Sequence, residues 1–468
     1  MGILANFKEK FIGDSAFYKR VLFIALPMIG QNAITSFVSF LDNIMVGMIG
    51  TEQMSGVAIV NQLIFVFNIC IFGGVSGAGI FGTQFFGKGD YEGQKYTFRF
   101  KIISIIVLTL IALGLGSFAG TELIQLYLSD SGDVGNVEMA LGFGKQYLSI
   151  MLFALFPFAL GQTYVSSIRE TGHTLIPMIA GFVAMVTNLV LDVVLIFGLG
   201  PVPTLGVQGA AIATVIARFV ECIIVVAWTH MHKEQNKYII GAYRNLYIPK
   251  NILKDILIKG TPLMLNEMLW ATGMAAIVQC YAVRGLEVVA AQNISSTITN
   301  LFNIVYLQLG CSISIIIGQL LGAGKIEEAK TTNTKLIFFD VVCCAGIAVI
   351  MMVVGRWFPN IYATEESIKE LARMFILISA LVMPLNAFCH CTYFTLRSGG
   401  KTGVTFLFDS VYMWVLVIPV ATFLAKYTEL PIVLVFFLVQ SLEFAKAIIG
   451  FFMVKSGVWL QNIVEEKE

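Results

Sequence analysis

The sequence predicts an all-α polytopic membrane protein, because its composition, its apolar runs and an internal repeat all favour this fold class. Only 13% of the residues are charged, 57% are hydrophobic, and the mean hydropathy is +0.83. A soluble domain carries about 25% charged residues, so the composition excludes an ordinary soluble protein. The length of 468 residues leaves room for about twelve transmembrane helices, because each needs roughly 20 apolar residues.

The second half of the chain repeats the first. With an offset of about 235, residues 20 to 101 align with residues 255 to 336, and both copies contain Phe-Asn followed by the frame QxxGxG. The matching pairs are Pro27 and Pro262, Asn68 and Asn303, Gln84 and Gln319, Gly87 and Gly322, and Gly89 and Gly324. Two related lobes predict a transporter, because rocking one lobe against the other exposes a site to each side of a membrane in turn.

Apolar runs divide the chain into two pseudo-symmetric six-helix lobes. We expect an N-lobe over residues 1–231, a polar cytoplasmic linker over 232–255 and a C-lobe over 256–468. The expected spans are residues 21–46, 54–83, 102–121, 142–168, 175–198 and 208–231, then 256–283, 288–321, 336–355, 371–396, 403–425 and 431–454.

The distribution of Lys and Arg predicts the orientation in the membrane. Segments on the side of the N-terminus hold roughly 21 of these residues, whereas the opposite loops hold about five. Cytoplasmic loops are enriched in Lys and Arg, so both termini should be cytoplasmic and the number of spans even. We expect a multi-pass protein of the plasma membrane, or of the inner membrane in a cell that has two.

Acidic side chains within the expected spans are the candidates for function, because burying each costs roughly 2.5 to 3.5 kcal/mol on insertion scales. Asp42 lies in the first span, and Asn188 and Asp192 lie four residues apart on one face of the fifth. Their oxygens can converge on one small cation such as Na⁺, or two neighbouring carboxylates can hold a proton. The alternative is that either acid forms a structural hydrogen bond near an extracellular helix end.

Glu267 in the seventh span is the candidate in the second half. It follows Asn266 and precedes Trp270 by one helical turn. A carboxylate beside an aromatic face can hold an organic cation, so we expect these three residues in a substrate cavity. The alternative is that Glu267 pairs with a neighbouring helix. Asp409 in the eleventh span is a weaker candidate.

Two further pairs of charged residues have opposite signs and lie three apart. They are Arg218 with Glu221 in the sixth span, and Glu443 with Lys446 in the twelfth. Spacing of three places both partners on one helical face, so we expect local ion pairs that lower the cost of burial, or contacts near the cytoplasmic side.

Other patterns predict structure and argue against an enzyme. Arg169 in RETGHT and Arg397 in RSGGKT fall at expected cytoplasmic helix ends, where a cation suits the helix dipole and the lipid headgroups. The stretch from Gly82 to Gly89 follows a membrane span and lacks a P-loop Lys-Ser/Thr, which excludes a nucleotide site. No nucleophile with a partnered His recurs, so we expect neither an enzyme nor a cofactor.

Five motifs together resemble one family. FLDNIMVG in the first span, QFFGKG after the second, RETGHT after the fourth, NLVLD in the fifth and GVQGAAIAT opening the sixth are similar to the multidrug and toxic compound extrusion (MATE) transporters of the MOP flippase superfamily. The resemblance implies two six-helix lobes around a V-shaped cavity. It also implies export of cationic or amphipathic drugs and toxins by alternating access, in exchange for inward flow of Na⁺ or H⁺.

The resemblance also implies site residues. The family's N-lobe cation site falls on Asp42, Asn188 and Asp192, with Thr214 as a fourth member. Glu267 matches an acid of the branch that uses its C-lobe, although that branch's second acid falls here on Asn386. The implied partners are the lipid bilayer and small organic cations, with no nucleic acid, and the protein is expected to be a monomer.

Two alternative functions remain open. Flippases for lipid-linked saccharides belong to the same superfamily but handle an anionic pyrophosphate, and they tend to place Arg or Lys inside the cavity. Here buried acids prevail in the expected cavity, which favours cations. A passive ion channel could also use buried acids, but channels generally close a ring around an axis instead of duplicating a lobe.

Overall fold

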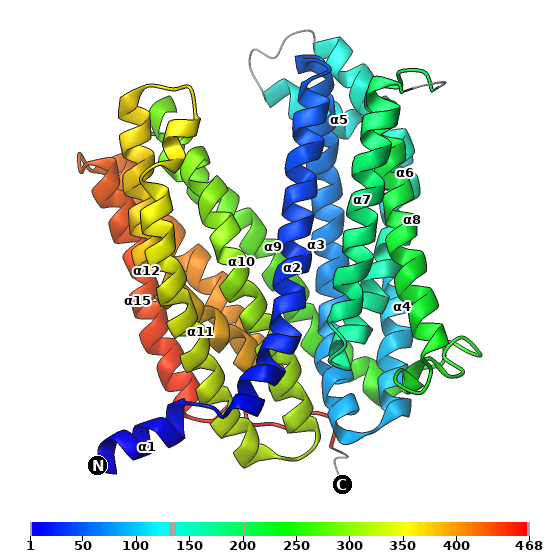
Figure 1. Ribbon diagram of the computed structural model, residues 1–468, viewed down its shortest axis with the longest axis vertical. Coiled ribbons are helices and arrows are strands. Elements are labelled where there is room, and N and C mark those ends of the chain that lie inside the picture. The colour runs from blue at the N-terminus through cyan, green and yellow to red at the C-terminus, as the bar shows by residue number, and fades with distance from the viewer. Residues whose placement is uncertain (1, 131–136, 200–201, 466–468) are drawn as a thin grey trace. The chain divides into compact units, whose positions relative to one another are not determined.

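The computed structural model describes residues 2–130, 137–199 and 202–465, and these residues form helices and turns without a strand (Figure 1). The expected all-α fold is confirmed for this part of the chain. Contacts divide the chain into two compact units. The N-unit comprises Leu26–Gly82 and Tyr91–Ile256, and the C-unit comprises the residues up to Ala25, Thr83–Asp90 and the chain from Leu257 onward.

Long apolar helices build the N-unit. Their bounds are α2 (Ser15–Gly47), α3 (Thr51–Lys88), α4 (Tyr91–Phe118), α5 (Gly120–Asp130), α6 (Val137–Glu170), α7 (Leu175–Phe197), α8 (Val207–Met231) and the short η1 (Lys237–Ile239). Residues of α2 up to Ala25 and of α3 from Thr83 belong to the C-unit. Gly209 of α8 lies against α7, where an added Cβ would be 2.6 Å from the Leu195 carbonyl oxygen. Small residues of this kind let membrane helices pack backbone to backbone.

The C-unit contains the remaining helices, except that the first residues of α9, up to Ile256, belong to the N-unit. Their bounds are α1 (Gly2–Phe11), α9 (Lys250–Ala282), α10 (Leu286–Gly322), α11 (Ile326–Gly355), η2 (Phe358–Ile361), α12 (Glu366–Ser398), α13 (Thr402–Phe406), η3 (Leu407–Val411), η4 (Met413–Val417), α14 (Ile418–Tyr427) and α15 (Ile432–Lys455). Of these, η3 and η4 are π-helical turns inside the continuous helical stretch 402–427. Apolar clusters around Phe375 and Met383 form the core of this unit.

The expected spans coincide with long helices, and one of them is unusually polar. Eleven helical stretches in the described residues are long and apolar enough to cross a membrane. The remaining expected span, the seventh, lies on α9, which has 33 residues but carries Asn266 and Glu267 in its middle. Helices α4 and α11 begin about ten residues before the expected apolar runs. The cause in α4 is visible, because the charged residues Arg99 and Lys101 are buried against protein partners.

The segment predicted as a linker packs within the N-unit. Tyr238, Ile239 and Ala242 are buried in the same apolar core as α4 and α6. Arg99 of α4 donates to three of its backbone carbonyls, with Nε to Ala242 at 2.8 Å and the terminal nitrogens to Gly241 and Tyr247 at 3.0 Å each. Because charge-assisted hydrogen bonds are strong, these contacts fix the middle of the segment to α4.

The repeated QxxG motif forms a self-complementary helix contact in the C-unit. A Cβ on Gly87, at the end of α3, would lie 2.0 Å from the Gln319 carbonyl oxygen of α10. A Cβ on Gly322 would lie 1.9 Å from the Gln84 carbonyl oxygen. In each copy of the motif, the absence of a side chain on the glycine leaves space for the backbone of the glutamine in the other copy. The Gln84 amide also donates to the Ser398 carbonyl at 2.8 Å, so the motif that reveals the repeat serves packing.

Replacement of Gly87 by Ala should lower the yield and stability of folded protein, because its methyl group has no space and the obstacle is backbone. Overpacking of this kind costs about 1–3 kcal/mol, and occasionally more. Gly346→Ala in α11 is the matched control, since nothing lies within 4 Å of its added Cβ. Thermal unfolding in detergent measures both, and equal melting temperatures would contradict the packing role of Gly87.

Candidate functional site

Two acids from different helices meet in the N-unit. Asp42 of α2 and Asp192 of α7 lie side by side, close enough for their carboxyl groups to share a proton. Asn188 precedes Asp192 by one turn, and the two residues are only 3% and 1% exposed. Among the described residues, neither oxygen of Asp192 and neither polar atom of the Asn188 amide has a hydrogen-bond partner. Buried polar groups usually have partners, so this cluster is the main candidate site for a cation or a proton.

Tyr147 of α6 completes this cluster and was missed by the sequence analysis. Its hydroxyl donates to Asn61 Oδ1 at 3.3 Å and lies beside Asp42, Asp192 and Thr214. The Thr214 hydroxyl donates back to the Ala210 carbonyl of its own helix at 3.0 Å, which leaves its oxygen free to accept. A single tyrosine in an apolar span carries no periodic or paired signal, so only the fold identifies Tyr147.

A cavity of about 430 Å³ adjoins this cluster within the N-unit. Asp42, Tyr147 and Thr214 line it, together with amide side chains of α3 such as Asn61 and aromatic and apolar side chains of α3 and α6. The cavity is in the range of volumes that hold drug-sized molecules. Asp42 therefore stands between the buried Asp192 and Asn188 on one side and an open space on the other.

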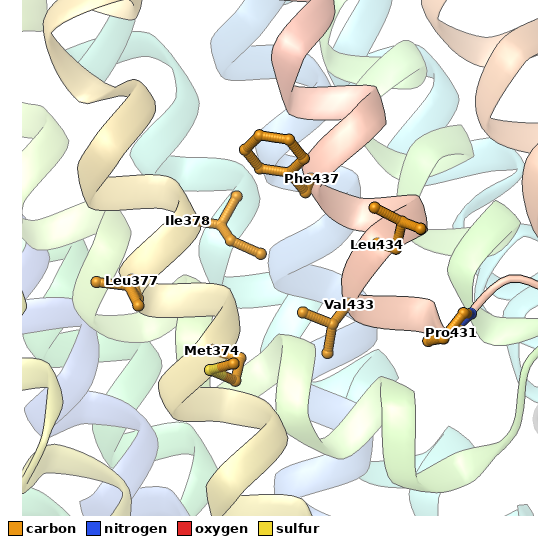
Figure 2. Close-up of a pocket in the computed structure, with 7 residues that line it drawn as sticks. All are labelled: Met374, Leu377, Ile378, Pro431, Val433, Leu434 and Phe437. Carbon is orange, nitrogen blue, oxygen red and sulfur yellow. The ribbon is translucent and has the colours of Figure 1, made fainter.

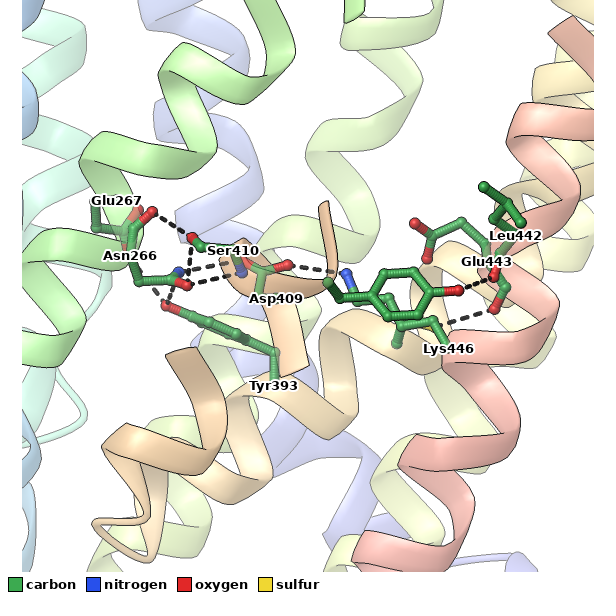
Figure 3. A network of polar contacts seen from close by, with 10 residues as sticks. Asn266, Glu267, Tyr393, Asp409, Ser410, Leu442, Glu443 and Lys446 are labelled. Atoms are coloured by element: carbon green, nitrogen blue, oxygen red, sulfur yellow. Dashed lines mark hydrogen bonds and ion pairs between the residues drawn. The ribbon is translucent and has the colours of Figure 1, made fainter. Parts of the chain in front are cut away.

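A second polar network lies in the C-unit (Figure 3). The Asn266 amide of α9 donates to Asp409 Oδ2 at 3.1 Å, and Lys446 of α15 donates to Asp409 Oδ1 at 2.9 Å. The Ser410 hydroxyl donates to Asn266 Oδ1 at 2.7 Å. The π-helical turn η3 carries Asp409 and Ser410, and such turns change the direction in which side chains project. The expected pairing of Lys446 with Glu443 is absent from the ion pairs of the described residues, and Lys446 binds Asp409 instead.

Glu267 is compensated by an arginine. Arg397 of α12 lies 3.6 Å from Glu267 Oε1, and the Tyr393 hydroxyl donates to the same oxygen at 3.2 Å. The expectation that Arg397 reaches the headgroups is wrong, because this residue is only 6% exposed and lies over the rings of Phe394 and Tyr393. Glu267 therefore pairs with a residue of a neighbouring helix, which was the alternative to a place in a substrate cavity.

The expected substrate contacts of Glu267, Asn266 and Trp270 stay predictions. Asn266 is 1% exposed and engaged by Asp409 and Ser410, whereas Trp270 is 40% exposed. Glu267 keeps 20% of its side chain exposed, so a ligand can reach it. Any cation there would have to compete with Arg397.

Two more sites of buried charge were not predicted from the sequence. Lys101 of α4 is fully buried and forms an ion pair with Glu170 at the end of α6, with Ser166 and Ser167 as further acceptors. Asp340 of α11 is 1% exposed and accepts hydrogen bonds from the thiols of Cys391 and Cys344 at 2.7 and 3.2 Å. Both acids were visible in the sequence, Asp340 inside an apolar run and Glu170 at its end, but their partners lie on other helices.

An apolar depression of about 410 Å³ lies between α12 and α15 (Figure 2). Its lining residues are Met374, Leu377, Ile378, Pro431, Val433, Leu434 and Phe437. None of these side chains has a polar group that could orient a ligand or bind an ion. The depression therefore offers nothing comparable to the cluster around Asp42.

The sequence matches the model of a known protein family. The MatE family model matches residues 27–194 and 262–423, one segment in each half of the chain and together more than half of its length. The chain belongs to the MatE family. The first matched segment contains Asp42, Asn188 and Asp192, and the second contains Glu267. Thr214 lies outside both.

Several relatives resemble this MatE protein over nearly all of its length. It is 22% identical over 413 residues to the Probable multidrug resistance protein NorM of Thermotoga maritima, covering 88% of this chain and 86% of the relative. It resembles a solved MOP superfamily transporter from Pyrococcus furiosus with a TM-score of 0.82 and 20% identity, covering 95% and 96% of the two chains. The MATE transporter VcmN of Vibrio cholerae in its bent form gives a TM-score of 0.81 at 19% identity, covering 96% and 99%. The likeness to these structures shows that the fold is that of MATE transporters.

Replacement of Lys446 by Met should destabilise this MatE protein by about 3 kcal/mol or more, because a buried Asp409 would lose its cation. The double variant Lys446→Met/Asp409→Asn removes both charges and should recover most of the loss. Thermal unfolding of the purified variants measures the difference. If the single and double variants unfold at the same temperature, the pair does not stabilise the C-unit.

Proposed function

We propose that this MatE protein is a secondary active antiporter that exports cationic and amphipathic organic compounds, including drugs and toxins, in exchange for Na⁺ or H⁺ by alternating access. The observation that carries the proposal is that Asp192 and Asn188, buried without hydrogen-bond partners among the described residues, lie beside Asp42, which lines a cavity. The name of the Thermotoga maritima relative supports the choice of drugs as cargo.

The chemistry of the cluster supports ion coupling. Two adjacent carboxylates repel each other, and a proton or a Na⁺ between them relieves that repulsion. For Na⁺, the donors would be oxygens of Asp42, Asp192, Asn188 and Thr214, which are the hard ligands that such a cation prefers. Asp42 also faces the cavity. A cationic substrate and the coupling ion would thus compete for one carboxylate, which is the mutual exclusion that an antiporter requires.

We also propose the location, the partners and the oligomeric state of the protein. The chain is a multi-pass membrane protein, and we propose the plasma or inner membrane as its location, with both termini cytoplasmic. Its partners would be the lipid bilayer and small organic cations, and it would work as a monomer without nucleic acid. It would change no covalent bond and would need no cofactor beyond the coupling ion.

Replacement of Asp42 by Asn should abolish gradient-driven transport while leaving the protein folded, because the amide cannot exchange a proton or neutralise a cation. Uptake of a labelled organic cation into proteoliposomes, under a Na⁺ gradient and a pH gradient imposed separately, measures this. Glu287→Gln, which removes an exposed acid, is the control and should transport normally. Undiminished transport by the Asp42 variant would refute the coupling role and leave a passive or differently coupled carrier.

The orientation can be tested with an impermeant maleimide on intact cells. A cysteine in place of the exposed Glu234, in the segment after α8, should be protected, and one in place of the exposed Glu429, between α14 and α15, should react. The eight native cysteines are buried or partly buried, which limits background labelling. The opposite labelling pattern would place both termini outside and contradict the proposed topology.

A further inference from the structure

The segment between α8 and α9 exposes large apolar side chains, although it lies outside the expected spans. Ile240, Tyr243, Leu246 and Tyr247 are each between 48% and 64% exposed. In Figure 1 the segment is the green loop beside the lower end of α8. Several large apolar side chains exposed on a short stretch of chain indicate that the stretch contacts a partner or a membrane.

The backbone of this segment is fixed, so the exposed side chains stay at the surface. Tyr238 is fully buried, and Arg99 of α4 donates hydrogen bonds to three carbonyls of the segment. The Tyr243 hydroxyl is hydrogen-bonded to the Tyr164 hydroxyl. The polar end of Tyr243 is therefore engaged within the N-unit, while its ring remains half exposed.

The same stretch of chain is positively charged. Residues 235–254 contain Lys237, Arg244, Lys250 and Lys254, all of them exposed, and no Asp or Glu. None of these four cations takes part in the ion pairs found in the described part of the N-unit. Those pairs are Lys95 with Glu92, Lys101 with Glu170, and Arg218 with Glu221, the last as predicted from the sequence. The charge of the four cations can therefore attract an external anion.

Charge and apolar surface together favour a lipid headgroup over a soluble anion. A soluble phosphate or carboxylate would contact the cations and leave Ile240, Leu246 and Tyr247 in water. The surface of a bilayer offers both contacts, because anionic headgroups attract Lys and Arg, and aromatic side chains favour the level of the headgroups. The segment joins α8, which ends at Met231, to α9, which begins at Lys250, so it lies where membrane helices end.

We propose that residues 237–250 form an interfacial anchor that binds the headgroups of anionic phospholipids. The cations of the anchor contact the headgroup phosphates, and its exposed apolar side chains enter the boundary between the headgroups and the acyl chains. The anchor belongs to the N-unit alone and holds the connection between α8 and α9 at the membrane surface. This inference is independent of the proposed export, which depends on Asp42.

Lipid binding by the purified full-length protein tests the proposal. Native mass spectrometry measures how much phosphatidylglycerol and phosphatidylcholine, with identical acyl chains, the protein retains in detergent. The wild type should prefer phosphatidylglycerol. In Lys237→Gln/Arg244→Gln its affinity for that lipid should fall about fivefold for each cation removed. Lys237→Arg/Arg244→Lys keeps both charges and should keep the preference.

A matched variant separates the anchor from a general effect of net charge. Lys325→Gln/Lys330→Gln removes two exposed cations from the region between α10 and α11, where Glu327 and Glu328 already offset them. This variant should bind lipid like the wild type. If both glutamine variants lose the preference equally, or if neither loses it while both melt at the wild-type temperature, the proposal is wrong.

The depth of the segment provides a second test that leaves its charge unchanged. A nitroxide spin label on Leu246→Cys, in nanodiscs that contain phosphatidylglycerol, should collide more often with oxygen than with a water-soluble nickel complex. A label on Glu234→Cys, which replaces an exposed acid just before the anchor, should show the opposite preference. If both labels meet the nickel complex equally, the segment lies in water, and the inference of a membrane contact is overturned. Coupled export through Asp42 could still stand in that case.

Discussion

The cost of burying charge in an apolar interior determines how this protein is arranged. A lone buried ion is so unfavourable that it must be paired or change its charge. In the described residues, Lys101 is matched by Glu170, Asp409 by Lys446, and Glu267 by Arg397. The contact between Asp42 and Asp192 departs from this pattern, because two acids lie together. Asp340 has no cation either, but it accepts hydrogen bonds from the Cys391 and Cys344 thiols. Neither oxygen of Asp192 has a donor among the described residues, and a binding site for an ion or a proton explains why this position is left incomplete.

The two halves share a sequence repeat, but their buried charged residues have different partners. In the C-unit each acid of the polar network has a cation within about 4 Å, and the amide of Asn266 fills the remaining acceptor. A network that is already neutral gains little from another cation. In the N-unit, Asp192 and Asn188 lack donors altogether, so an added ion or proton changes the energy of the site. Ion coupling therefore fits the N-unit better, although both halves carry membrane-buried acids.

The helices and part of the site are predictable from the sequence, and each feature that is not predictable has a physical reason. Apolar runs identify spans, but they miss charged helix starts such as the region of Arg99, whose charge is compensated by backbone carbonyls. Asn188 and Asp192 were recognisable because spacing along one helix places them on one face. Contacts between helices leave no such trace, so Tyr147 and the partner of Lys446 were missed. The π-helical turn that directs Asp409 toward Lys446 has no periodic signature either.

The repeat also explains why the identical positions are not the functional ones. Gly87 meets the backbone of Gln319 and Gly322 meets that of Gln84, so a change in either copy disrupts one shared contact. A self-complementary contact constrains both copies at once. Asp42, Arg218 and Glu267 make no such reciprocal contact, so each half was free to acquire its own charges. Divergence between the copies thus marks where they took on different tasks, and identity marks where they pack against each other.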